Sequence, residues 1–262
     1  MRISFLSFAG LMAAAWCFPC WAATPVAESK ATTPPVGMFE AMKAGQVEVQ
    51  YIPLDESRQA KLLIKNKTKE PLSLKLPANF GAAPINAQLG GLGGGNNNNR
   101  NGRNQNQQIG GGFGGGGGGF GGGGLGGGGM GGGGLFNLPP EKVGELKVAT
   151  ACLEHGKLEP SKHIAYEVVP LEQCTSKPGV AEALAVLAEG KTNQKVAQAA
   201  VWHLANGLTW EQLAAKKVNR VGRADTPYYE PAELHAAIEL TKHVEKLAKD
   251  NASKSEKTSS SE

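Results

Sequence analysis

Apolar and polar positions alternate with a period of two in the first half of the chain, outside its glycine-rich part. In "QVEVQYIPLD" (46–55) and "PLSLKLP" (71–77), every second residue is apolar. This alternation is typical of half-buried β-strands. Between them, "AKLLIKNKTKEP" (60–71) predicts a strand that enters a turn at residues 66–71.

The same alternation returns after the glycine-rich part. "GELKVATACLEHGK" (144–157) and "HIAYEVVPLE" (163–172) both predict strands. Strands on either side of the glycine-rich part favour one small antiparallel β-sandwich with an immunoglobulin-like outline, spanning residues 46–176.

From Lys177 onward the apolar residues follow a helical period. Thr209, with Gln212 three positions later, forms a capping-box pattern. The polar end, residues 250–262, predicts a disordered tail. We therefore expect an α+β protein in which a small helical bundle (177–249) follows the sandwich. Its four predicted helices lie within residues 177–190, 192–207, 209–217 and 230–250.

Glycine dominates the middle of the chain. Of the 37 glycines, 27 fall between Gly90 and Gly134, next to an Asn/Gln run. This composition predicts a disordered low-complexity loop over residues 89–136, inserted into the sandwich. Stretching a connection from about five to about forty-five residues costs only about 2 kcal/mol in closure entropy, which a modest sheet tolerates.

Two interpretations of this loop stay open. It is either a tolerated repeat expansion or a flexible strand whose spaced apolar side chains act as weak adhesive points. The second interpretation predicts self-association through the loop. The spaced apolar residues are Phe113, Phe120, Leu125, Met130 and Leu135.

The N-terminus has the order of a secretory signal: a cation at Arg2, an apolar stretch to about Phe18, and small residues near Ala22. We assign residues 1–23 to a signal peptide and residues 24–45 to a linker. An uncleaved membrane anchor is the alternative. After cleavage we expect no transmembrane span and a secreted, periplasmic or cell-envelope location.

Charge and motifs narrow the function further. The formal net charge of +4 is mild and gives no case for nucleic-acid binding. The chain contains no GxSxG, HExxH or GxxxxGK[ST] pattern, so we expect no cofactor and no enzyme activity. The prediction is a binding or structural module whose partner is a component of the cell envelope or matrix.

Two cysteines lie in the predicted folded part. In an oxidising compartment, Cys152 and Cys174 are candidates for a disulfide, which would contribute about 3 kcal/mol in the chain-entropy model. A metal site using these cysteines with His155 and His163 has the right residue types. Its irregular spacing matches no accepted zinc pattern, and we assign no metal.

Two short stretches carry a family resemblance. "AQAAVWHL" (197–204) resembles the TQxA motif of bacterial thioester adhesin domains, with Ala197 at the threonine position. "ACLEHGK" (151–157) resembles the segment that carries the cysteine of that family. The resemblance implies a covalent surface adhesin in which Cys152 supplies the thiol and Gln198 the acyl group. Ordinary helix packing, with Trp202 as a core residue, is the competing interpretation.

A second resemblance covers most of the predicted mature chain. "NKTKEPLSLKLPANF" (66–80) and "WHLANGLTWEQLA" (202–214) are similar to stretches of glycine-rich secreted proteins of planctomycete-type bacteria. This resemblance agrees with an exported protein and implies no activity.

Overall fold

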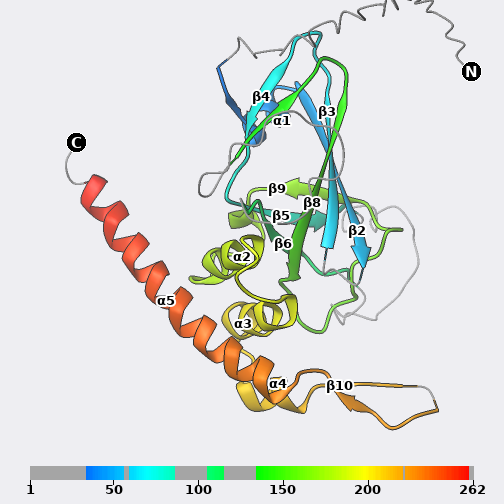
Figure 1. The fold of residues 1–262 in the computed structure, drawn as a ribbon, viewed down its shortest axis with the longest axis vertical. Coiled ribbons are helices and arrows are strands. Elements are labelled where there is room, and N and C mark those ends of the chain that lie inside the picture. Colours follow the sequence, from blue (N-terminus) through cyan, green and yellow to red (C-terminus); the bar gives the residue numbers. More distant parts are fainter. Residues whose placement is uncertain (1–33, 56–58, 86–104, 115–133, 221, 260–262) are drawn as a thin grey trace, which may run out of the picture. The chain divides into compact units, whose positions relative to one another are not determined.

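Six antiparallel strands close into a barrel (Figure 1). The computed structural model describes residues 34–55, 59–85, 105–114, 134–220 and 222–259. Around the barrel the order is β2, β3, β8, β6, β5 and β9, and the strands pair antiparallel. Their bounds are β2 Val47–Asp55, β3 Gln59–Asn66, β5 Asn79–Pro84, β6 Ile109–Gly112, β8 Val143–Cys152 and β9 Tyr166–Val169.

The prediction of an immunoglobulin-like sandwich is therefore wrong, although the α+β class is correct. A sandwich needs two separate sheets, whereas here the sheet closes on itself. β9 pairs with β5 over four residues and with β2 at Tyr51 and Tyr166. β6 fills the space between β5 and β8. Alternating burial is common to sandwiches and barrels, so the pattern alone does not distinguish them.

β6 lies within the segment 89–136, which the sequence predicts to be one loop. Its sequence is "IGGG", and all four residues are buried. Gly110 and Gly112 lie beneath helix α2 (Val180–Ala188): a Cβ at Gly110 would stand 2.5 Å from a Leu184 methyl, and one at Gly112 would stand 2.7 Å from the Ala188 Cβ. Glycine is thus the residue that lets the helix approach the barrel wall this closely.

A second, three-stranded sheet packs on one end of the paired strands β3 and β8. It consists of β1 (Val36–Gly37), parallel to β4 (Leu72–Lys75), and β7 (Leu135–Leu138), antiparallel to β4. Helix α1 (Met38–Lys43) lies in the segment that the sequence assigns to a linker, and its Met38 and Ala41 are buried. A Cβ at Gly144 of β8 would stand 2.4 Å from the Phe136 ring, so this glycine lets the two sheets meet.

One buried side chain organises the turn between β3 and β4. Asn66 is fully buried, and its Nδ2 donates to the carbonyls of Glu70, Leu138 and Pro139 at 2.8, 3.3 and 3.1 Å. Its Oδ1 accepts from the backbone and hydroxyl of Thr68, both at 2.8 Å. Asn66–Lys67–Thr68 also fits the N-glycosylation pattern, but the burial of Asn66 makes it unsuitable as an acceptor.

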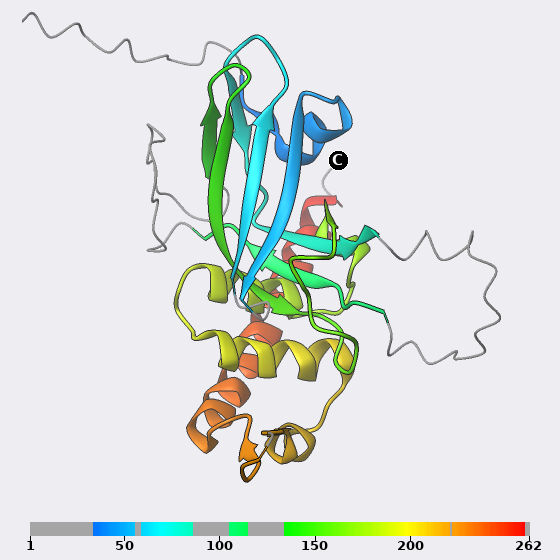
Figure 2. The ribbon, with the colours of Figure 1, turned by 90° about the vertical axis from the view of Figure 1, so that its right-hand side faces the viewer.

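Helices follow the barrel, as the period predicts (Figure 2). The predicted Thr209–Gln212 capping box is confirmed. α5 continues through most of the segment 250–262, because a packed N-terminal half lets a sequence free of Gly and Pro propagate the helix. The elements are a 3-10 helix at Leu171–Gln173, α2, α3 (Gln194–Asn206), α4 (Trp210–Ala215), the hairpin of β10 (Lys217–Val218) and β11 (Thr226–Pro227), and α5 (Pro231–Ser259).

Burial divides the interior into three clusters. The first fills the barrel and includes Leu62, Phe80 and Ile109. The second lies between the barrel wall and the helices α2, α3 and α5. The third gathers around Trp202 and Tyr229, on the other side of α3. β8 contributes to all three, which explains why its last residues, Thr150 to Cys152, are buried on both faces.

Candidate functional site

The end of β8 and the middle of α3 meet through a side-chain amide. Gln198 is 2 % exposed; its Nε2 donates to the carbonyl of Cys152 at 2.8 Å and its Oε1 accepts from the amide of Cys152 at 2.9 Å. The pairing of β8 with β3 ends at Ala149. Gln198 thus satisfies backbone groups of β8 beyond the reach of β3, as a neighbouring strand would.

The two residues that the thioester resemblance implies are therefore brought together. The contact runs through the backbone of Cys152 and the carboxamide of Gln198. Gln194, one turn earlier on α3, donates weakly to the same Oε1 at 3.4 Å. Because two buried hydrogen bonds hold the carboxamide in place, this contact by itself explains why a glutamine occupies the helix position.

The predicted disulfide between Cys152 and Cys174 is wrong. Neither cysteine of the described chain is in a disulfide. Cys152 belongs to the cluster around Trp202, whereas Cys174 packs against the cluster between the barrel and α2. The Cys174 sulfur lies above β5, where a Cβ on Gly81 would stand 2.5 Å from it. The two thiols therefore face different cores.

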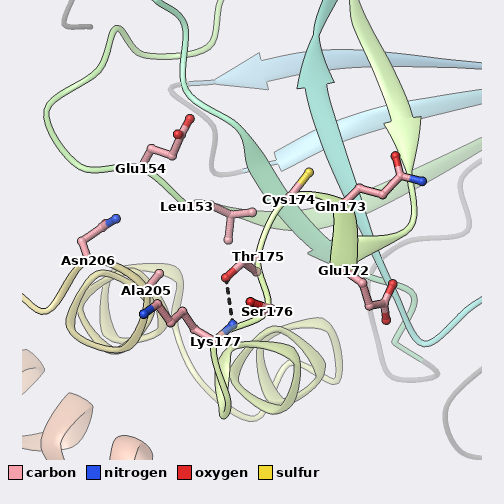
Figure 3. Close-up of a pocket in the computed structure, with 10 residues that line it drawn as sticks. All are labelled: Leu153, Glu154, Glu172, Gln173, Cys174, Thr175, Ser176, Lys177, Ala205 and Asn206. Carbon is pink, nitrogen blue, oxygen red and sulfur yellow. Dashed lines mark hydrogen bonds between the residues drawn. The ribbon is translucent and has the colours of Figure 1, made fainter.

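Cys174 lines a surface pocket of about 390 Å³ between the end of β8, the loop 172–177 and the end of α3. Figure 3 shows its sulfur directed toward the strands. Burial, with the nearby Glu154 carboxylate, raises the pKa of the Cys174 thiol to about 11. A thiol with this pKa stays protonated at neutral pH and is a poor nucleophile.

Glu154, the acidic residue on the same pocket wall, is already engaged. One carboxylate oxygen accepts from the backbone amide of Gln108, just before β6, at 2.9 Å. The other pairs with Lys157 at 2.5 Å. Asn206, also in the pocket, accepts from the amide of His155 at 3.0 Å. These polar groups therefore connect the residues that flank β6 and β8 to α3.

Three buried phenols lie near Cys152. Burial raises the pKa of Tyr51, Tyr166 and Tyr229, and the charge of a nearby Cys152 thiolate would add to each rise. Phenols with raised pKa values stay neutral at physiological pH. None of these three phenols is therefore suited to exchange a proton near neutrality.

The candidate metal ligands do not gather. Across residues 34–55, 59–85, 105–114, 134–220 and 222–259, no group of three or more His, Cys, Asp or Glu side chains is arranged to hold a metal ion. His155 is exposed and contacts the Trp202 ring, and His163 is exposed on the loop before β9. The structure therefore does not bring them together with the two cysteines.

A cluster of rings and cations surrounds Trp202, and the sequence patterns do not predict it. The His155 ring meets Trp202 edge-on, with 4.8 Å between centroids. The Lys216 Nζ lies 5.0 Å from the Trp202 centroid and 5.1 Å from that of Tyr228. Partial burial and the Lys216 ammonium lower the pKa of His155. The residues of this cluster around Trp202 are spread over positions 155–228, so no local sequence motif identifies the cluster.

The comparisons with known proteins give no family. No family model, no curated protein and no solved structure matches this chain. Of the helices that the structure describes, none combines the length and the apolar character needed to span a bilayer.

Proposed function

We propose that the protein is a non-catalytic, exported binding or structural module of the cell envelope or matrix. The observation that carries this proposal is the position of β6. This glycine strand is a buried wall of the barrel, between β5 and β8. The glycine-rich sequence is therefore connected to the core through β5, β6 and β7. The core would thus carry two inserted segments, residues 86–104 between β5 and β6 and residues 115–133 between β6 and β7.

The chemistry of the core supports a role without catalysis. The Cys174 thiol has a raised pKa, and the Gln198 amide is held by two hydrogen bonds. Glu154 is occupied by Lys157 and by the backbone of Gln108. At these three positions, side chains that could take part in acyl transfer or acid–base chemistry are thus protonated or held in structural contacts.

The experiment must spare β6. Deleting the whole glycine-rich segment would remove a barrel strand and unfold the core, so binding loss would be uninformative. The sharper variant replaces Phe120, Leu125 and Met130 with Ser, which keeps the length of the second insertion. The matched control replaces three glycines of the same insertion, Gly117, Gly122 and Gly127, with Ser.

The measurement is the share of full-length protein that sediments with the envelope and matrix fraction of the producing cells. We expect the wild type to sediment and to be released by denaturant, the F120S/L125S/M130S variant to lose most of this association, and the glycine control to keep it. Recovery of the wild type entirely in the soluble exported fraction would contradict the proposal. Unchanged sedimentation of the triple variant would remove the adhesive role of the insertion.

A second candidate function rests on one contact, that between Gln198 and Cys152. In a covalent adhesin, the Cys152 sulfur would attack the Gln198 carboxamide carbon and release ammonia, leaving an internal thioester that a target amine could open. Covalent attachment has a distinct signature: protein captured through a thioester stays with the envelope after denaturant, whereas non-covalently bound protein is released.

A further inference from the structure

Four cations cluster in the segment that joins α4 to α5. The basic hairpin, residues 216–220 and 222–228, contains β10 and β11 and is closed by a hydrogen bond from the Tyr228 amide to the Lys216 carbonyl at 2.9 Å. One acid, Asp225, lies in it and accepts from the backbone amide of Arg220. The four cations are Lys216, Lys217, Arg220 and Arg223.

None of these four side chains has an ion-pair partner within the described part of the chain. Five other lysines of that part, Lys61, Lys157, Lys191, Lys195 and Lys242, are each paired with a glutamate, whereas exposed lysines such as Lys65 and Lys67 are in no ion pair either. Lys217, Arg220 and Arg223 are exposed, and Lys216 is half-buried. The hairpin therefore brings four cations together with a single acid, in a chain whose formal net charge is only +4.

The base of the hairpin is held in place. The Lys216 ammonium lies over the Trp202 ring and the Tyr228 ring. The Lys195 Nζ also lies over Tyr228, 5.8 Å from the ring centroid. Cation–π contacts of this kind fix a lysine that would otherwise be mobile. The three exposed cations beyond Lys216 take part in none of these contacts, so packing does not account for them.

We infer that the basic hairpin is a contact surface for a polysaccharide that carries carboxylate groups. Arginine guanidinium groups pair with carboxylates through two parallel hydrogen bonds, and a row of lysine and arginine attracts a polyanion over several ångströms. The inference deepens the proposed function and rests on it for the class of partner, since an acidic polysaccharide is a component of an envelope or matrix.

The same surface fits nucleic acid less well. Single-stranded nucleic acid is bound by stacking its bases on exposed aromatic rings. Here the two rings at the base of the hairpin are occupied: Trp202 is 5 % exposed and contacts His155 and Lys216, and Tyr228 contacts both lysines and Tyr229. The exposed part of the hairpin supplies charge without a stacking platform.

The test compares two triple variants of the full mature protein that lose the same charge. The first is K217Q/R220Q/R223Q in the hairpin. The second, K65Q/K67Q/K69Q, removes three exposed lysines at the β3–β4 turn. Binding to immobilised polygalacturonate is measured at low and moderate salt, with dextran as the neutral polymer and duplex and single-stranded DNA as the competing class.

We expect the wild type to bind polygalacturonate in a salt-dependent way and not to bind dextran. The hairpin variant should bind roughly tenfold more weakly, as expected for the loss of three exposed ion pairs, and the turn variant should stay within about twofold of the wild type. Equal weakening of both variants would mean non-specific charge attraction and would overturn the assignment. Absence of wild-type binding, or tighter binding to DNA, would overturn it as well.

The envelope measurement separates this inference from the proposed function. If the wild type sediments with the envelope but does not bind polygalacturonate, or if the hairpin variant binds it as the wild type does, the hairpin assignment is wrong while the proposed function stands. If the wild type does not sediment at all, the proposed function itself is wrong.

Discussion

Gly114 lies against the carbonyl of Ala188, the last residue of α2: a Cβ on the glycine would stand 1.8 Å from that oxygen. An alanine there requires the end of α2 or the backbone at residue 114 to shift, because the Ala188 carbonyl is a backbone atom and cannot rotate aside. We expect Gly114→Ala to lower the free energy of unfolding by roughly 1–3 kcal/mol, the usual cost of overpacking. Urea unfolding monitored by circular dichroism measures it.

The same glycine-rich sequence supplies the control. Gly134 precedes β7, and a Cβ built on it meets nothing within 4 Å. Gly134→Ala should therefore leave the urea midpoint at or slightly above that of the wild type. Equal midpoints for the two alanine variants would contradict the close packing of α2 on the barrel.

Gln198→Leu removes both hydrogen bonds to the Cys152 backbone. Two buried backbone groups then lose their partner, at about 1–3 kcal/mol each, so we expect a loss of roughly 2–5 kcal/mol in unfolding free energy. Cys152→Ala keeps the backbone groups and should cost less, about 1 kcal/mol for the lost packing of the thiol. Differential scanning calorimetry of both variants tests whether Gln198→Leu is the more destabilising substitution. A Gln198→Leu protein as stable as the wild type would refute the role of this side chain as the hydrogen-bonding partner of the Cys152 backbone.

His155 should make stability depend on pH. Its pKa is lowered from 6.5 in the folded state, first by burial and then by Lys216, so the unfolded chain binds the proton more readily. The neutral imidazole therefore favours folding above about pH 6.5, and this contribution is lost as the pH falls through the lowered folded pKa.

The measurement is the urea midpoint of the wild type and of His155→Gln between about pH 8 and pH 5, the range in which histidine titrates. The wild type should lose more stability than the variant toward acid pH. Superimposable profiles would show that His155 does not sense the Lys216–Trp202 cluster.

Both thiols should be slow to react in the folded protein. Cys152 is protected by burial, because it is only 5 % exposed. Cys174 is protected by its pKa of about 11, since at pH 8 roughly one thousandth of such a thiol is thiolate. We expect iodoacetamide to leave Cys152 and Cys174 unmodified in buffer and to modify both in denaturant without reductant. Peptide mass spectrometry reads this out, and protection that persists in denaturant until reductant is added would reveal a disulfide.

Much of the fold follows from local patterns. Alternating apolar residues mark the strands around Tyr51 and Val148 because each has one face in the barrel core. Thr209 and Gln212 mark a helix start because both side chains satisfy backbone groups that every helix leaves open.

Closure of the barrel could not be predicted from such patterns. It depends on β6, where three of the four residues are glycine and no side-chain alternation exists. The reason for glycine at these positions is a tertiary contact: α2 occupies the space that side chains at Gly110 and Gly112 would need. Glycine in a low-complexity tract otherwise indicates a loop, so only the tertiary contact distinguishes the strand.

In the candidate site, too, local patterns identify single residues, whereas tertiary contacts determine which residues meet. Gln198 stands out because of its place in "AQAAVWHL", yet its bonding to the Cys152 backbone depends on where β3 stops pairing. The Trp202 cluster brings together residues as distant as His155 and Tyr228, which no spacing rule connects.

We propose that Cys152 and Gln198 form a structural pair, joined by the two hydrogen bonds to the Cys152 backbone, in a protein that binds without covalent chemistry. Intact mass of the purified mature protein, before and after treatment with methylamine, tests it most directly. We expect the mass of the unmodified chain, with both thiols present and no uptake of amine. A mass lower by one ammonia, with methylamine then captured at Gln198, would contradict it and establish a thioester.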